Sequence, residues 1–149
     1  SNGIPVLLAR RTAVPKVTVN LRFDAGYAVD TPDQAGVHSL MVETLEEGTR
    51  TRNATQIAED QERLGADISA SAGLDSSDVT LTALSANLAP SLALMADVVR
   101  NPAFAEKDVA RVKDQRLATI GQQLASPQGI ASRALMPLVY GEAHPYGKV

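Results

Sequence analysis

Two stretches of alternating residues joined by a short turn constrain the fold of this chain more than any other feature. Apolar and polar residues alternate over residues 66–73 and again over residues 77–85. A period of two places alternate side chains on opposite faces of a strand, so each stretch has one apolar face. The intervening Gly73-Leu74-Asp75-Ser76 is rich in residues that favour tight turns. The pair therefore predicts an antiparallel hairpin with one face buried.

The rest of the pattern predicts two more strands and a series of helices. Residues 16–23 alternate strictly and residues 4–9 form a short apolar run, and we expect both as strands. Apolar residues recur at helical spacing in residues 35–47, 53–64, 87–99, 106–124 and 126–140. In the first of these helices, Leu40, Met41 and Leu45 are expected to pack on the sheet. The order β-β-α-α-β-β-α-α-α predicts an α+β fold, in which helices pack on one face of an antiparallel sheet.

Length and composition fit one domain or part of one, and they exclude several kinds of site. The chain has 149 residues, of which 44% are apolar and only 3% aromatic, so its core must be aliphatic. The net charge is −3 and basic residues are scattered, which argues against nucleic acid as a partner. The chain contains no cysteine, which excludes disulfides and thiolate metal sites. No apolar run approaches the ~18 residues that span a bilayer, so we expect no membrane span.

Three stretches that follow one another along the chain resemble a known family. The first reads GVHSLMVETLEEGT at residues 36–49, and the second is Leu64-Gly65-Ala66 followed by the alternating hairpin. The third comprises Asn101-Pro102-Ala103-Phe104, a long charged helix and His144-Pro145-Tyr146-Gly147. In this order they resemble the M16 family of zinc metallopeptidases, of the pitrilysin, insulinase and mitochondrial-processing-peptidase type, whose zinc helix typically reads GLAHFLEHMLFKGT. The resemblance covers essentially the whole chain and implies the M16 peptidase/LuxS-like metallohydrolase fold.

The resemblance also implies that the zinc-binding residues of the family are replaced in this chain. Active members bind zinc through two His on adjacent helical turns and a later Glu, while a Glu between the two His acts as the base. Aligned without gaps, the first His falls on Ser39, the base on Val42 and the second His on Glu43. The third-ligand segment falls on residues 117–120, which contain no acid. We therefore expect no catalytic, metal-binding or cofactor-binding residue here, and an inactive segment.

Several other residues admit both a structural and a functional interpretation. His38 has no imidazole or carboxylate one helical turn away, and we interpret it as a surface or capping residue. We interpret His144-Pro145-Tyr146 as a turn rather than a peptide contact, and residues 24–27 as a structural turn. Ser39 has no His or Lys base near it in the sequence, which disfavours a serine hydrolase. The acids at the end of the first predicted helix are interpreted as its solvated face rather than as a cation site: Glu43, Glu46 and Glu47.

The resemblance implies two alternative functions. The first is a non-catalytic half of an M16-type zinc metallopeptidase, which forms the wall of a peptide-binding chamber opposite an active half that holds the zinc. That active half would belong to the same chain or to a separate subunit, and the substrate would be an unfolded peptide. The alternative is a structural or assembly subunit similar to the core proteins of the respiratory bc1 complex. The family suggests the bacterial periplasm, although the sequence itself leaves the compartment open.

We expect residues 1–149 to be the N-terminal part of a single domain that is incomplete at its C-terminus. Members of the family continue after the His-Pro-Tyr-Gly motif with another helix and a returning strand. Without these elements the predicted sheet has a bare edge, and bare edges recruit other chains. We therefore expect this chain to self-associate.

Overall fold

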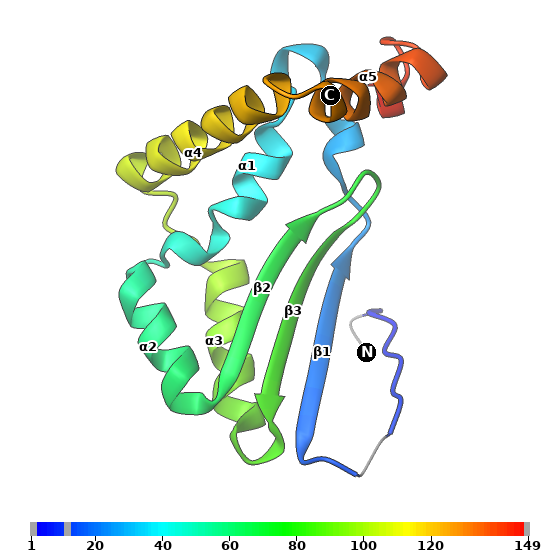
Figure 1. Cartoon of the computed structure of the whole chain (residues 1–149). Helices are drawn as coiled ribbons and strands as arrows, with labels where there is room; N and C mark the ends of the chain where they lie inside the picture. The colour runs from blue at the N-terminus through cyan, green and yellow to red at the C-terminus, as the bar shows by residue number, and fades with distance from the viewer. Residues whose placement is uncertain (1–2, 11–12, 148–149) are drawn as a thin grey trace.

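The alternating stretches form a three-stranded antiparallel sheet in the computed structural model, which describes residues 3–10 and 13–147 (Figure 1). The strands are β1 (Lys16–Phe23), β2 (Ala66–Ala72) and β3 (Ser77–Leu84). The central strand is β3, which pairs antiparallel with β1 on one side and with β2 on the other. The predicted hairpin of β2 and β3 is therefore confirmed, and the fold is α+β as expected.

The helices divide into a group on the sheet and a group at its end. The helices are α1 (Val37–Glu43), α2 (Ala54–Leu64), α3 (Leu88–Arg100), α4 (Glu106–Leu124) and α5 (Pro127–Tyr140). Helices α1 and α2 contact β2, and α3 contacts β3. Helix α4 contacts α1 and α5, and α5 lies at the end of the molecule where the β2–β3 turn is found (Figure 1). None of the helices within the described ranges is long and apolar enough to cross a membrane.

The core lies between the sheet and helices α1 to α3, and it is aliphatic as predicted. Leu81 of β3 and Val98 of α3 are both 0% exposed. Each fully buried side chain of this size stabilises the fold by about 1.5–3 kcal/mol. The buried cluster comprises Val42, Leu45, Ile57, Leu64, Ile68, Val79, Leu81, Ala83, Leu94, Met95 and Val98.

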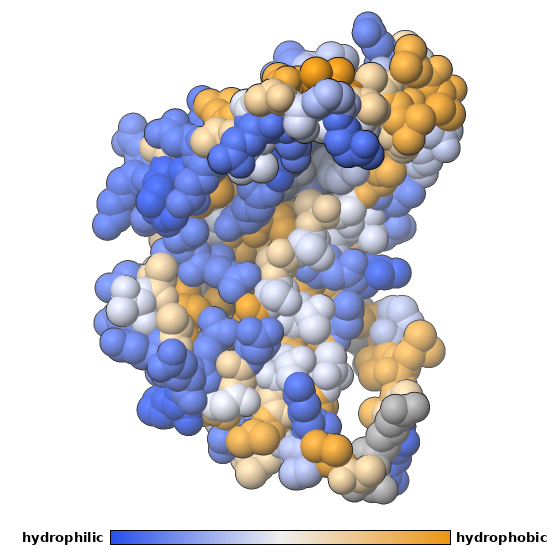
Figure 2. Space-filling view, in the orientation of Figure 1, coloured by the Kyte–Doolittle hydropathy of each residue, from blue (hydrophilic) through white to orange (hydrophobic). Residues whose placement is uncertain are grey.

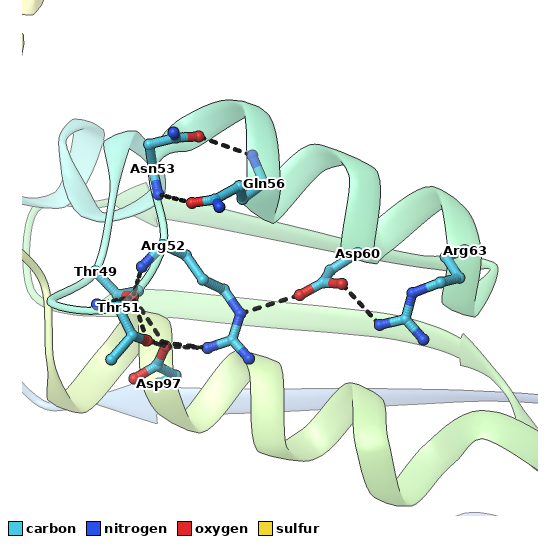
Figure 3. Close-up of polar contacts among 8 residues, drawn as sticks. All are labelled: Thr49, Thr51, Arg52, Asn53, Gln56, Asp60, Arg63 and Asp97. Carbon is cyan, nitrogen blue, oxygen red and sulfur yellow. Dashed lines mark hydrogen bonds and ion pairs between the residues drawn. The ribbon is translucent and has the colours of Figure 1, made fainter.

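A carboxylate network joins the turn before α2 to both α2 and α3 (Figure 3). Asp97 Oδ2 of α3 accepts hydrogen bonds from Thr49 Oγ1 at 2.9 Å and from Arg52 Nη1 at 2.7 Å. Arg52 Nε also donates to Asp60 Oδ2 of α2 at 3.0 Å. These donors, with the Asn101 side chain as the largest cause, hold the pKa of Asp97 below its ordinary value. The network therefore fixes the chain between α1 and α2 against α3.

The predicted strand at residues 4–9 is wrong. Within the described residues 3–10 no strand is formed, and Leu7 is 99% exposed. Figure 1 shows this segment beside β1 but apart from it, and β1 pairs with β3 alone. A short apolar run becomes a strand only where a neighbouring strand supplies backbone partners, and its composition does not reveal whether that neighbour exists. The sheet therefore has three strands in the described residues rather than the expected four.

The predicted helix at residues 35–47 is shorter than expected, and its buried face is rotated. Helix α1 ends at Glu43 and a 3₁₀ turn, Leu45–Glu47, follows. The Thr44 hydroxyl donates to the carbonyl oxygens of Leu40 at 2.8 Å and Met41 at 2.9 Å, and such back-bonding competes with a regular helix. Leu45 is buried as expected, but Leu40 is only half-buried and Met41 is exposed. Ser39 and Val42 occupy the buried face of α1 in their place.

Candidate functional site

A cleft of about 760 Å³ lies between α1, β2, α4 and α5, and we call it the α1–α5 cleft. It brings together residues far apart in the sequence, and its lining mixes polar side chains with small apolar residues. Helix α1 contributes Ser39 and Glu43, β2 contributes its last three residues, and α4 contributes Arg116 and Gln123. The α5 side is lined by Gln128, Gly129, Ser132, Arg133 and Met136 together with Ser126. The cleft therefore combines polar and charged side chains with an apolar surface contributed by alanine, glycine and methionine residues.

The residues aligned with the family's zinc ligands lie at this cleft, but they do not point the same way. Ser39 and Glu43, aligned with the two His, both line it. Val42, aligned with the base, is 3% exposed and packs in the hydrophobic core. On α4, Arg116 and Gln123 line the cleft on either side of residues 117–120, the segment aligned with the third ligand. Of the four aligned positions, the structure thus brings Ser39 and Glu43 to the cleft, whereas Val42 lies in the core and residues 117–120 do not line the cleft.

Two ion pairs connect α1 and the turn after it to α4. Glu43 Oε1 accepts from Arg116 Nη1, and Glu47 Oε2 accepts from Arg111 Nη2. The expectation that these acids form a solvated face is therefore only partly right, because each carboxylate has a long-range partner. One signal in the sequence could have predicted these ion pairs. Glu43 and Glu47 are four residues apart, and Arg111 and Arg116 are five residues apart on another helix, so the two pairs can face each other.

The donor set at the aligned positions does not fit zinc. Ser39 offers a hydroxyl, Val42 offers no donor, and the Glu43 carboxylate faces a guanidinium that would repel a cation. A protein zinc site takes at least three Cys, His or carboxylate ligands. Within residues 3–10 and 13–147, no group of three or more His, Cys, Asp or Glu side chains is arranged to hold a metal ion. No chemical step through a metal follows from these residues.

His38 lies behind the cleft and bridges α1 to β3. Its Nε2 lies 2.7 Å from Ser77 Oγ, and that hydroxyl donates to the Ala25 carbonyl oxygen at 2.9 Å. Because the Ser77 hydrogen is used in this way, we assign His38 Nε2 as the donor. At the start of α1, Asp30 Oδ2 accepts from the backbone N–H groups of Gly36 at 3.0 Å and His38 at 3.3 Å. His38 is thus a half-buried structural residue that joins α1 to β3, and the interpretation as a surface or capping residue is wrong.

The outer edge of β2 is partly closed by side chains. The N–H of Ile68 donates to Gln61 Oε1 at 2.7 Å, and the N–H of Ala70 donates to Glu46 Oε1 at 3.1 Å. Backbone N–H groups alternate along a strand, so the N–H of Ala72 faces the same edge, at the α1–α5 cleft. Burial raises the pKa of Glu46 above its ordinary value, and the Ala70 hydrogen bond only partly offsets this. The bare edge that we expected is therefore occupied at two positions of β2.

The two sequence-predicted turns lie against the β2–β3 hairpin. Pro145–Gly147 forms a 3₁₀ turn, and Tyr146 OH donates to the two Asp75 carboxylate oxygens at 2.8 and 2.7 Å. In the loop after β1, Tyr27 N–H donates to the Gly73 carbonyl oxygen at 3.0 Å. The hairpin backbone approaches Gly26 so closely that it leaves no room for a Cβ. Both segments are therefore structural, although Tyr27 also lines the α1–α5 cleft.

Comparison with known proteins gives a consistent result over nearly the whole chain. The family model described as Insulinase (Peptidase family M16) matches residues 5–144. An "Uncharacterized zinc protease" of Rickettsia bellii (strain RML369-C) is 29% identical over 147 residues, which are 99% of this chain and 35% of that protein. The "Mitochondrial-processing peptidase subunit alpha" of Solanum tuberosum is 28% identical over 147 residues, 99% of this chain and 29% of that protein.

A solved structure agrees with the observed fold. The crystal structure of a peptidase M16 inactive domain from Pseudomonas fluorescens superposes with a TM-score of 0.86 and 36% sequence identity. The match covers 92% of this chain and 33% of that chain. The chain thus spans about a third of the length of these relatives, between 29% and 35%.

Proposed function

Because the chain belongs to the insulinase family of peptidases, Peptidase family M16, we propose that it is part of a non-catalytic half that forms the wall of a peptide-binding chamber. The observation that carries the proposal is the Glu43–Arg116 ion pair in the α1–α5 cleft, because Glu43 aligns with the second zinc-binding His of the family. An ion pair between two helices stabilises their packing but supplies no Lewis acid and no activated water. Hydrolysis therefore falls to a partner half, which carries the zinc.

The lining of the α1–α5 cleft supports a role in holding a peptide rather than cleaving it. An extended peptide can add to the edge of a sheet through backbone hydrogen bonds, a mode that tolerates many sequences. In this chain Gln61 and Glu46 already accept from two N–H groups of the β2 edge. The edge remains open at Ala72, which lines the cleft. A peptide therefore contacts β2 over one or two residues and takes its other contacts from α4 and α5.

The test compares the zinc-bearing half with and without this chain. That half is the M16-type partner with an intact His-x-x-Glu-His motif, encoded in the same or a neighbouring gene. We expect cleavage of a fluorescence-quenched unstructured peptide only when both are present, and we expect Ser39→Ala in this chain to leave the rate unchanged. Equal cleavage without this chain would contradict the proposal. A chain that is needed only for assembly of a larger complex would instead be a structural subunit.

A further inference from the structure

Arg133 of α5 is a cation that lines the α1–α5 cleft and forms no ion pair with a carboxylate among the described residues. The charged side chains that line the cleft are Asp30, Glu43, Arg116 and Arg133. Asp30 is buried and accepts from two N–H groups at the start of α1, and Glu43 is paired with Arg116. Arg133 is left with a neutral contact, because its Nη1 donates to Gln123 Oε1 at 3.3 Å.

The surroundings of Arg133 leave its guanidinium free to bind a ligand. A guanidinium has five N–H donors in a planar fork, and the Gln123 oxygen takes one of them. The side chain is half-buried, so that water screens it less than it would a fully exposed arginine. The neighbouring Ser126 hydroxyl is engaged, since it accepts from the Gly129 N–H at 3.1 Å to cap α5 and donates to the Gln123 carbonyl oxygen at 3.3 Å. Arg133 is therefore the charged recognition element of this side of the cleft, where Gln128 and Ser132 are its neutral polar neighbours.

We propose that the α1–α5 cleft binds an extended peptide through a carboxylate on Arg133, while the peptide backbone meets the open end of β2 at Ala72. Planar carboxylates match the guanidinium fork with two parallel hydrogen bonds, which gives both affinity and direction. The carboxylate comes either from the C-terminus of the peptide or from an acidic side chain, which share the same chemistry. This inference rests on the proposed peptide-holding function and adds to it a preference for peptides that carry a carboxylate.

The experiment uses three ten-residue peptides of Ala, Ser, Thr and Val, each with an uncharged BODIPY label, titrated with the chain by fluorescence anisotropy. The first ends in an amide and has no acid, the second ends in a free carboxylate, and the third has an amide end and one internal Glu. We expect at least one acidic peptide to bind about tenfold more tightly than the neutral one. The second and third peptides distinguish the two sources of the carboxylate.

Two variants separate recognition by Arg133 from a general effect of charge. Arg133→Gln is expected to remove the tenfold preference while leaving affinity for the neutral peptide unchanged. The matched control Arg100→Gln loses the same charge at an exposed position of α3 outside the cleft and should retain the preference. Circular dichroism would verify that both variants fold.

The outcomes are distinct for the two proposals. Equal binding of all three peptides, unaffected by Arg133→Gln, would overturn the carboxylate preference and leave the peptide-holding function standing. A preference that survives in Arg133→Gln would also overturn it, because another group would then be responsible. The absence of binding to any of the peptides would overturn both the preference and the proposed function of this cleft.

Discussion

The sheet with α2 and α3 and the region of α4 and α5 bury their apolar residues to very different extents. In the first region, Ile57, Leu81 and Val98 are at most 1% exposed. In the second, α5 has no buried residue, and Leu138 is 83% exposed. Figure 2 shows hydrophobic surface at the upper right, where α5 lies in Figure 1. Both regions have apolar residues at helical or strand spacing. The comparison teaches that such a pattern predicts an element, whereas the contacts that bury it depend on which neighbours are present.

Truncation of a core leucine should have the largest effect and tests this comparison directly. Leu81→Ala removes a fully buried side chain and leaves a cavity, which should lower the free energy of unfolding by about 2–5 kcal/mol. The matched variant Leu138→Ala should change it by no more than about 0.5 kcal/mol. Urea denaturation of the two variants and of the parent chain measures both changes in the free energy of unfolding. Equal losses in the two variants would mean that α5 is buried in solution.

Loss of the Asp97 network should have the second-largest effect on stability, because this network joins the turn before α2 to α3. Asp97→Ala removes the acceptor of Thr49 and Arg52 and should lower the free energy of unfolding by about 1–3 kcal/mol. The depressed pKa of Asp97 means that its contribution is complete above the ordinary carboxyl value of 3.8 and is lost as the pH falls through the lower folded value. The exposed Asp114→Ala is the control, and a similar loss there would show that the network adds nothing.

Substitution of Glu46 should have the smallest effect on the free energy of unfolding, and it should stabilise the protein rather than destabilise it. Burial raises its pKa, so its contribution to stability is fully present below the ordinary value of 4.5 and is lost as the pH rises through the higher folded value. Glu46→Gln keeps an oxygen for the Ala70 N–H but cannot ionise. At pH 7 this variant should be as stable as the parent or more stable by up to about 1 kcal/mol, and the gain should vanish below pH 4.5.

Urea denaturation at several pH values measures the Glu46 effect, with the exposed Glu59→Gln as its control. A clear destabilisation by Glu46→Gln at pH 7 would show that the charged carboxylate, rather than any oxygen acceptor, holds the β2 edge. The same result would strengthen the contrast between an edge closed at Ala70 and one open at Ala72.

Local sequence patterns were sufficient to predict those helices and strands whose formation depends mainly on their own residues. The β2–β3 hairpin and the helices follow from alternation and helical spacing, and the positions of Ser39 and Glu43 follow from motif order. The prediction of a strand at residues 4–9 was wrong because an apolar composition does not supply a partner strand. The prediction of the buried face of α1 was wrong because spacing within a helix does not show which side meets its neighbours, and here Ser39 and Val42 are buried.

The polar contacts of the candidate site were beyond the reach of sequence patterns for a related reason. The Glu46 carboxylate meets a backbone N–H that lies 24 residues further along the chain, and Glu43 meets Arg116 after 73 residues. Such contacts depend on how α1, α4 and β2 pack together, which the spacing of residues within one element does not encode. Arg133 stood out as a cation without an ion pair only once α5 was placed beside the other charged residues of the α1–α5 cleft.

Zinc content of the purified chain tests the central claim, that this part of the family fold is non-catalytic, most directly. After dialysis against micromolar zinc, we predict far less than one zinc per chain by elemental analysis, because Ser39 and Val42 replace a ligand and the base and Glu43 is paired. The M16-type half with an intact His-x-x-Glu-His motif, dialysed and measured in the same way, is the positive control that shows that the assay detects bound zinc. One tightly bound zinc per unmodified chain, lost on His38→Ala, would contradict the account.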